Sequence, residues 1–418
     1  MPLPVVDRAI HVATRRCWVP ADLESVTAIG DANDADPVVA EIWGLVEDVY
    51  RSGMHPGIQI CIRHRGDVVM DRAIGHARGN LPGYPIDPDR LTPMAIDTPV
   101  NLFSAAKAVT AMAMHKLEEL GALDLDDPVA EYVAGFERHG KGSITIRQVL
   151  THRAGIPTFP ARAFDLDLLT DHERLTQILC DLRPSSPPGA TPAYHAVSGG
   201  FVMEAVARGA ADRSLRDVLA TEIKEPLGLG WFDYGVAPEH AQLVAQNVET
   251  GLPVGPALGT FMRRVLGRGW SRVLRMSNDP RFLSGVIPSA NVIVTARDAA
   301  TFYQCLMNGG SVAGTRVFDE TTVAGAVAPV QALEIDRMLG VPMRYSSGFM
   351  LGSESVSLYG WNHPRIFGHL GMSNLFTWAD PERDLAVAFL ATGKPVFGSH
   401  LPPLVRLISG IHERFPAR

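Results

Sequence analysis

Residues 102–114 read Leu-Phe-Ser-Ala-Ala-Lys-Ala-Val-Thr-Ala-Met-Ala-Met, and this window constrains both the fold and the chemistry. Small and apolar residues with high helix propensity dominate it, and Gly121 follows as a stop signal. We therefore predict a helix that is buried on nearly all sides. Lys107 is the only charged residue in the window. Because burying an unpaired ammonium is costly, desolvation should lower the pKa of Lys107.

Ser104 lies three residues before Lys107, so the two side chains share one face of the expected helix. An uncharged amine beside a hydroxyl is the arrangement that turns a serine into a nucleophile. Ser-x-x-Lys is a short pattern that also arises by chance, and its weight comes from its place early in an apolar helix. We take Ser104 as the candidate nucleophile and Lys107 as the group that activates it.

A loop rich in proline and glycine, residues 188–200, supplies a second candidate group. It carries Tyr194 just before a helix that is expected to begin near Ser198. The phenol could hydrogen-bond Ser104 and exchange a proton with it during acyl transfer. The alternative is a tyrosine packed in its loop with the hydroxyl on the backbone.

A third segment, residues 367–374, enters a strand and contains His369 and Gly371. Gly371 would let a substrate approach the strand backbone closely. The N–H of Met372 could then act together with that of Ser104 as an oxyanion hole. A single histidine such as His369 is more often structural than catalytic.

Outward from these segments, strand patterns occur near both ends of the chain, while the middle is mainly helical. The expected helices and strands are a helix at 38–53, a hairpin of 57–64 with 67–74 around Arg65-Gly66, a meander at 368–370, 374–379 and 385–391, and a closing helix at 404–415. We predict an α+β fold in which an antiparallel sheet, built from both termini and flanked by helices, carries an inserted and mostly helical lobe.

The whole chain, 1–418, is expected to form one catalytic domain with two subdomains. Residues 1–100 and 330–418 would form the sheet subdomain, and residues 101–329 the helical one. Within the latter, residues 252–276 look like an insertion with five arginines among apolar side chains. This insertion is either a mobile cap over an apolar substrate or a solvated helical pair with one buried side.

Ser104-Ala-Ala-Lys107, Tyr194 and His369-Leu-Gly371 resemble, in order and spacing, the three motifs of serine β-lactamases and penicillin-binding proteins. The similarity covers residues 57–393 and is greatest to the class C-like branch that contains family VIII carboxylesterases and related lipases. The resemblance implies that Ser104 is the nucleophile, Lys107 its activating partner and Tyr194 the base or proton shuttle. It also implies an oxyanion hole made by the amides of Ser104 and Met372.

Two departures from the family pattern bear on the substrate. Ala196 stands where β-lactamases of this branch have the asparagine of Tyr-x-Asn, and His369-Leu-Gly371 replaces Lys-Thr-Gly. A neutral imidazole is a poorer carboxylate anchor than an ammonium. Ala196, His369 and Gly371 are the expected substrate contacts, and they favour a small-molecule ester over a peptide-like carboxylate.

The predicted function is therefore that of a serine ester hydrolase, like a carboxylesterase or lipase, acting through an acyl-enzyme on Ser104. Three alternatives remain: a β-lactamase or D-Ala-D-Ala-type peptidase, an acyltransferase, and a non-catalytic protein that retains the fold. The sequence contains no metal-ligand or nucleotide motif, so we expect no cofactor and no metal.

Composition limits the partners and the location. With 418 residues and a net charge of −7, the chain does not have the basic character typical of nucleic-acid binding. Its four cysteines lie far apart, which predicts buried free thiols in a reducing compartment. Neither an apolar stretch of signal-peptide length in the first twenty residues nor a membrane-spanning run of about 18 apolar residues is found. We therefore expect a cytoplasmic protein.

Overall fold

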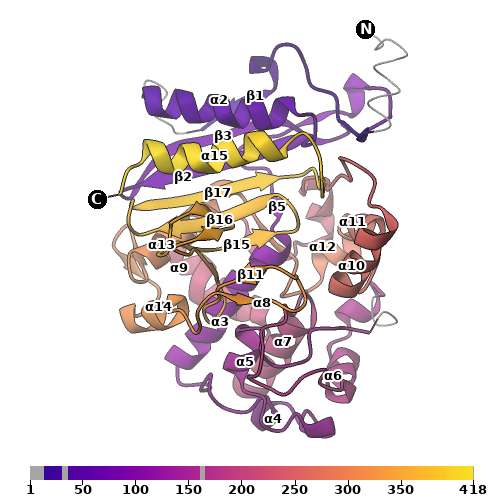
Figure 1. The fold of residues 1–418 in the computed structure, drawn as a ribbon, viewed down its shortest axis with the longest axis vertical. Coiled ribbons are helices and arrows are strands. Elements are labelled where there is room, and N and C mark those ends of the chain that lie inside the picture. The colour runs from indigo at the N-terminus through magenta and orange to yellow at the C-terminus, as the bar shows by residue number, and fades with distance from the viewer. Residues whose placement is uncertain (1–13, 31–35, 161–164, 418) are drawn as a thin grey trace.

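The computed structural model describes residues 14–30, 36–160 and 165–417, and its centre is one antiparallel sheet (Figure 1). In spatial order the strands are β1 (Thr27–Ile29), β3 (Asp67–Arg78), β2 (Gly57–His64), β17 (Leu385–Ala391), β16 (Leu375–Asp380), β15 (Phe367–Gly371) and β12 (Met350–Leu351), with β4 (Thr92–Pro93) beside β3. β2 and β3 pair around the Arg65-Gly66 turn, and β17 pairs with β2 along its whole length. The predicted α+β fold, with a sheet built from both ends of the chain, is confirmed.

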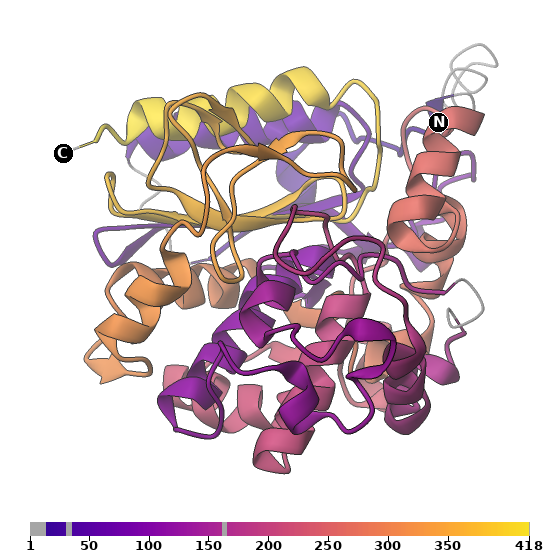
Figure 2. The same cartoon turned by 60° about the horizontal axis from the view of Figure 1, so that its bottom comes forward.

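The two faces of the sheet are covered by different helices. α2 (Pro37–Arg51) and α15 (Leu401–Arg414) lie side by side on one face, whereas α13 (Ala296–Met307) packs on the other (Figures 1 and 2). Side chains alternate between the faces along each strand. Ile60 of β2 therefore belongs to the core under α2, while Cys61 belongs to the core on the side of α13.

α15 begins at Leu401, three residues before the predicted start, because its first turn accommodates two prolines. Prolines there remove only amide donors that a helix leaves unpaired in any case. The division into subdomains at residues 100 and 329 stays a prediction. α13 falls within the predicted helical segment, yet it packs against the sheet.

The helical lobe lies below the sheet and is built around α3 (Ala106–Glu119) (Figure 2). Residues 108–115 of this helix are all buried, as the composition of the window predicts. The other helices of the lobe are α4 (Val129–Tyr132), α5 (Ile146–Leu150), α6 (His172–Asp181), α7 (Ser198–Ala211), α8 (Leu215–Leu219), α9 (Glu225–Leu227) and α12 (Pro280–Ser284), with α14 (Glu320–Val327) beside α3.

Short strands that the sequence pattern did not predict accompany these helices. A three-stranded sheet joins β5 (Val100–Asn101), β7 (Val292–Val294) and β6 (Phe232–Tyr234). Three hairpins pair β8 (Ser311–Val312) with β9 (Thr315–Arg316), β10 (Glu334–Ile335) with β11 (Pro342–Met343), and β13 (Val356–Ser357) with β14 (Gly360–Trp361). Strands of two or three residues are too short to show a recognisable alternation.

The expected insertion at 252–276 forms a helical pair, α10 (Pro256–Leu266) and α11 (Trp270–Met276). Its inner side is buried, since Trp270 and Leu274 pack against Phe103. Its outer side is solvated, with exposed arginines at positions 263, 264, 272 and 275. The structure therefore resembles the second interpretation, a solvated helical pair with one buried side. The buried side lies next to the candidate nucleophile.

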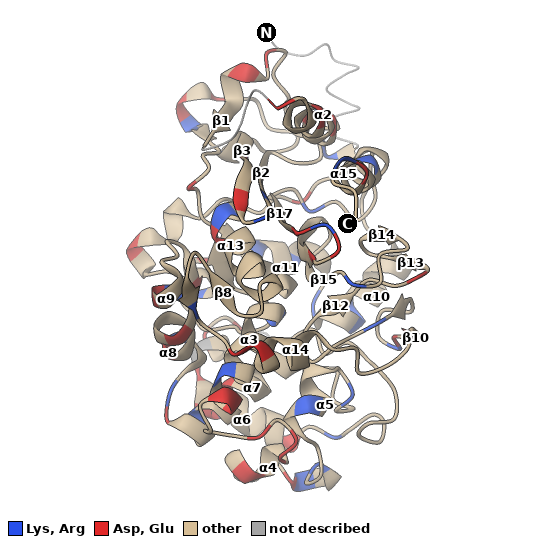
Figure 3. Cartoon of the chain, turned by 90° about the vertical axis from the view of Figure 1, so that its left-hand side faces the viewer, with Lys and Arg blue, Asp and Glu red and all other residues tan. Residues whose placement is uncertain are grey.

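Cysteine state, charge distribution and the lengths of the helices complete the description. All four cysteines are buried free thiols. Basic and acidic residues are interspersed over the elements seen in Figure 3 and do not gather into one basic face there. Within the described ranges, no helix combines the length and the apolar character needed to cross a membrane.

Candidate active site

Ser104 sits in a short 3-10 turn, Phe103–Ala105, that leads directly into α3. Phe103 has a φ of 48°, a left-handed conformation that is strained for a bulky side chain. Asn101 supports it by accepting a hydrogen bond of 3.2 Å from the Phe103 N–H. Backbone strain that the surroundings hold in place is concentrated at functional sites, and here it lies at the residue before the candidate nucleophile.

Lys107 lies one turn beyond Ser104, with Nζ 3.3 Å from Oγ. The same nitrogen donates a hydrogen bond of 3.0 Å to the carbonyl of Ser289 and lies 4.9 Å from the ring centre of Tyr194. Burial lowers the pKa of Lys107 from its ordinary value of 10.5 to about 7. A large share of this amine is therefore uncharged at neutral pH, and its lone pair can accept the Ser104 proton.

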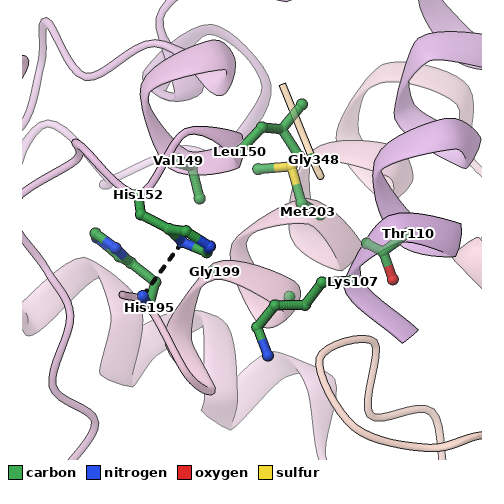
Figure 4. Close-up of a pocket in the computed structure, with 10 residues that line it drawn as sticks. Lys107, Thr110, Val149, Leu150, His152, His195, Gly199, Met203 and Gly348 are labelled. Atoms are coloured by element: carbon green, nitrogen blue, oxygen red, sulfur yellow. Dashed lines mark hydrogen bonds between the residues drawn. The ribbon is translucent and has the colours of Figure 1, made fainter. Parts of the chain in front are cut away.

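A cavity of about 30 Å³ lies next to Lys107, which is one of its lining residues (Figure 4). His152 and His195 line it, and the backbone N–H of His195 donates a hydrogen bond of 3.2 Å to Nδ1 of the His152 ring. Burial lowers the pKa of His195 to about 4 and that of His152 well below its usual range, so both rings are neutral. No carboxylate of the described residues lines this cavity, so nothing there restores the positive charge on Lys107.

Tyr194 completes the cluster. Its phenol is hydrogen-bonded to the Ser104 side chain, and the residue is only 5% exposed. Burial raises the pKa of Tyr194 above its ordinary value because a phenolate would lose its hydration. The phenol therefore stays protonated and can pass a proton between Ser104 and a leaving group. The structure brings Ser104, Lys107 and Tyr194 together, as the sequence predicts.

Asp336 is a buried carboxylate that the sequence analysis missed, and it anchors the loop of Tyr194. Its Oδ1 accepts hydrogen bonds from the backbone N–H groups of Tyr194, at 3.1 Å, and of Met338 and Leu339, at 2.8 Å each. Its Oδ2 accepts the hydroxyl of Tyr345 at 2.9 Å. The bond to Tyr194 joins positions 142 residues apart, and no local pattern signals it.

An apolar pocket of about 70 Å³ opens beside Ser104. Ser104 is its single polar lining residue in the described part of the chain. The other residues that line this apolar pocket are Phe103, Leu169, Ala196, Val197, Leu266, Val273, Met276, Phe282, Ile287, Ala290 and Met372. Ala196 and Met372, two predicted site residues, are thus placed at the same pocket as the nucleophile. Ser104 and Met372 both line it, and the oxyanion hole formed by their backbone N–H groups stays a prediction.

Gly371 has a packing role that the sequence did not predict. A Cβ on this residue would come within 2.2 Å of the Leu102 carbonyl oxygen. The glycine therefore lets β15 pack against the segment that carries Ser104, and its part in substrate approach stays a prediction. Met372 follows with a φ of 52°, a second left-handed residue beside the nucleophile.

His369 is buried, and its predicted role as a substrate contact stays a prediction. It is 1% exposed, its Nδ1 bonds the Leu370 carbonyl at 2.9 Å, and it is not among the described residues that line the apolar pocket. Its ring centre lies 6.3 Å from that of Tyr194. Burial lowers the pKa of His369 to about 3, so the ring is neutral and offers no charge to a substrate carboxylate.

The described residues form no metal centre. Nowhere in residues 14–30, 36–160 and 165–417 do three or more His, Cys, Asp or Glu side chains gather so that they could hold an ion. The arrangement brings together a hydroxyl, an amine of lowered pKa and a protonated phenol, which are groups that acyl transfer uses.

The protein class follows from this fold and site: the chain is a serine hydrolase with the β-lactamase fold. The family model described as Beta-lactamase matches residues 45–409, and the chain belongs to this family. The resemblance inferred from the three motifs is thereby confirmed.

The similarity to individual proteins is illustrated by three relatives. The esterase/beta-lactamase LipL of Mycobacterium tuberculosis is 30% identical over 309 residues, which cover 71% of this chain and 70% of LipL. A penicillin-binding protein homologue from Caulobacter crescentus has a TM-score of 0.77 at 26% identity, covering 92% of this chain and 99% of its own. A family VIII carboxylesterase has a TM-score of 0.75 at 25% identity, with coverages of 90% and 97%.

Proposed function

We propose that this protein hydrolyses carboxylic esters through an acyl-enzyme on Ser104. The observation that carries the proposal is the position of Lys107 Nζ, a desolvated amine with a pKa of about 7, at 3.3 Å from Ser104 Oγ. The neighbouring apolar pocket supplies a place for an uncharged substrate. This choice of substrate class is supported by two relatives that are described as esterases, LipL and the family VIII carboxylesterase.

The reaction proceeds in two steps. Ser104 Oγ attacks the acyl carbon while its proton passes to the uncharged amine of Lys107, and the amides of Ser104 and Met372 hold the negative oxygen. The ester bond breaks, and the alcohol leaves with a proton relayed from Lys107 through the Tyr194 phenol. Water then attacks the acyl-enzyme, loses its proton to the same pair, and releases the acid and free Ser104.

An ester fits this site better than a β-lactam or a peptide that bears a carboxylate. No charged side chain among the described residues lines the apolar pocket, and His369 is neutral and buried. A substrate carboxylate would therefore lose hydration without gaining a partner. Ala196 likewise offers only a methyl group at the pocket wall.

The test compares Ser104→Ala with the matched control Ser311→Ala, in which the altered serine lies in β8, away from the site. We expect p-nitrophenyl butyrate hydrolysis to fall at least about a thousandfold in the first variant only, with unchanged circular dichroism in both. Hydrolysis that survives Ser104→Ala would overturn the proposal.

Three further assays separate the alternatives. Nitrocefin turnover that exceeds ester turnover would indicate a β-lactamase. New esters formed with an added alcohol, in place of free acid, would indicate an acyltransferase. Absence of all these activities, together with an unreactive Ser104, would indicate a protein that retains only the fold.

A further inference from the structure

The apolar pocket has a wall that belongs to the α10–α11 pair. Leu266 of α10 and Val273 and Met276 of α11 line it directly. The pair is held in place from behind, since Trp270 is 6% and Leu274 is 3% exposed, and both pack on Phe103. This wall is therefore a packed part of the structure attached to the residue that precedes the nucleophile.

The position of the proton donors decides which half of an ester enters this pocket. The leaving alcohol has to receive a proton, so it must lie on the side of Tyr194 and Lys107. Neither of these residues is among those that line the apolar pocket. Because Ser104 lines the pocket and the two proton donors do not, the group that extends into it from the reacting carbon is the acyl chain.

The size of the pocket limits the chain. A water-sized group needs about 10–15 Å³ of such space. A pocket of about 70 Å³ is only a few times this size, so it has room for a short chain beyond the carbonyl carbon. Phe282 of α12 and Ile287 also line the pocket and are buried, so a longer chain would have to displace packed side chains.

Resting on the proposed function, we propose that the apolar pocket is the acyl-binding site and that α11 restricts it to short, uncharged acyl groups, from butanoyl to hexanoyl. Val273 is the residue that limits the length, because it faces the pocket from the middle of α11.

The experiment measures kcat/KM for p-nitrophenyl esters from acetate to dodecanoate in the wild type and in Val273→Trp, Val273→Ala and Arg272→Ala. The wild type should prefer butanoate and hexanoate and lose activity beyond octanoate. Val273→Trp should lower the value for hexanoate about tenfold or more while acetate stays within about twofold. Val273→Ala should move the preference toward longer chains. Arg272→Ala changes the exposed neighbour of Val273 and should leave the profile unchanged.

A second substrate series identifies the half of the ester that Val273 contacts. Acetate esters of increasing alcohol length should be hydrolysed with the same profile by the wild type and Val273→Trp. A change in the alcohol profile, or an acyl profile that no Val273 variant alters, would overturn the assignment of the pocket. Labelling of Ser104 by a fluorophosphonate helps to distinguish a failure of the pocket assignment from a failure of the proposed function. An enzyme that hydrolyses esters with an unaltered profile contradicts only the pocket, whereas a wild type without ester hydrolysis contradicts the proposed function as well.

Discussion

Replacing Lys107 by methionine should remove activity and at the same time stabilise the protein at neutral pH. Methionine has a similar length, carries no charge and suits an apolar helix. In the unfolded chain the lysine amine is protonated at pH 7, whereas burial in the folded protein lowers its pKa from 10.5 to about 7. Folding therefore favours loss of a proton from the Lys107 amine, which would stay protonated in water.

The size of this effect follows from the pKa. At about 1.4 kcal/mol for each unit of pKa, burial of Lys107 lowers the free energy of unfolding by roughly 4 kcal/mol at pH 7. The folded-state pKa is the lower one, so this stability is present above pH 10.5 and is lost as the pH falls toward 7. At pH 10 the loss is only about 1 kcal/mol. Methionine leaves the Ser289 carbonyl without its donor, which costs about 1–3 kcal/mol at either pH.

We expect Lys107→Met to be about 1–3 kcal/mol more stable than the wild type at pH 7 and no more stable at pH 10. Urea unfolding followed by tryptophan fluorescence measures both values. The control is Lys116→Met on the same helix, which removes hydrogen bonds to Glu119 and to the Val317 carbonyl and should destabilise the protein. A Lys107→Met variant less stable than the wild type at pH 7, or an equal difference at both pH values, would refute the reasoning.

Three kinetic predictions follow from the same site. Because Lys107 must lose its proton to act, kcat/KM for a butyrate ester should rise about tenfold between pH 6 and pH 8; a flat profile would exclude an amine with a pKa of about 7 as the base. Tyr194→Phe should lower kcat roughly a hundredfold in steady-state assays, since the proton relay to the alcohol is removed, and an unchanged kcat would place the relay elsewhere. Asp336→Asn should lower kcat about tenfold and leave KM within about twofold, because the Tyr194 loop loses its anchor. An effect confined to KM would show that Asp336 does not position the phenol.

The parts of the site that the sequence predicted are those with a local cause. Ser104 and Lys107 are three residues apart on one helix, so their contact needs no knowledge of the rest of the fold. The low pKa of Lys107 follows from a window without any other charge. The sheet was predictable for a similar reason, since alternating patterns at both ends of the chain leave few other ways to bury their apolar faces.

The parts that were missed depend on contacts between distant segments. Asp336 supports the Tyr194 loop from 142 positions away, and an isolated aspartate in a loop carries no signal of that contact. The packing role of Gly371 was also missed. The Leu102 carbonyl that approaches this glycine is 269 positions away in the sequence, so their contact is known only from the folded chain. The apolar pocket combines side chains from α10, α11, α12 and several loops, so its walls appear only in the folded chain.

Peptide mass spectrometry after exposure to a fluorophosphonate probe tests the nucleophile most directly. At pH 8, where Lys107 is uncharged, we predict one adduct per chain, on the peptide that contains Ser104, formed in parallel with the loss of ester hydrolysis. The adduct should form far more slowly in Lys107→Met. Labelling of a different residue, or full hydrolysis by a protein completely labelled at Ser104, would contradict the account.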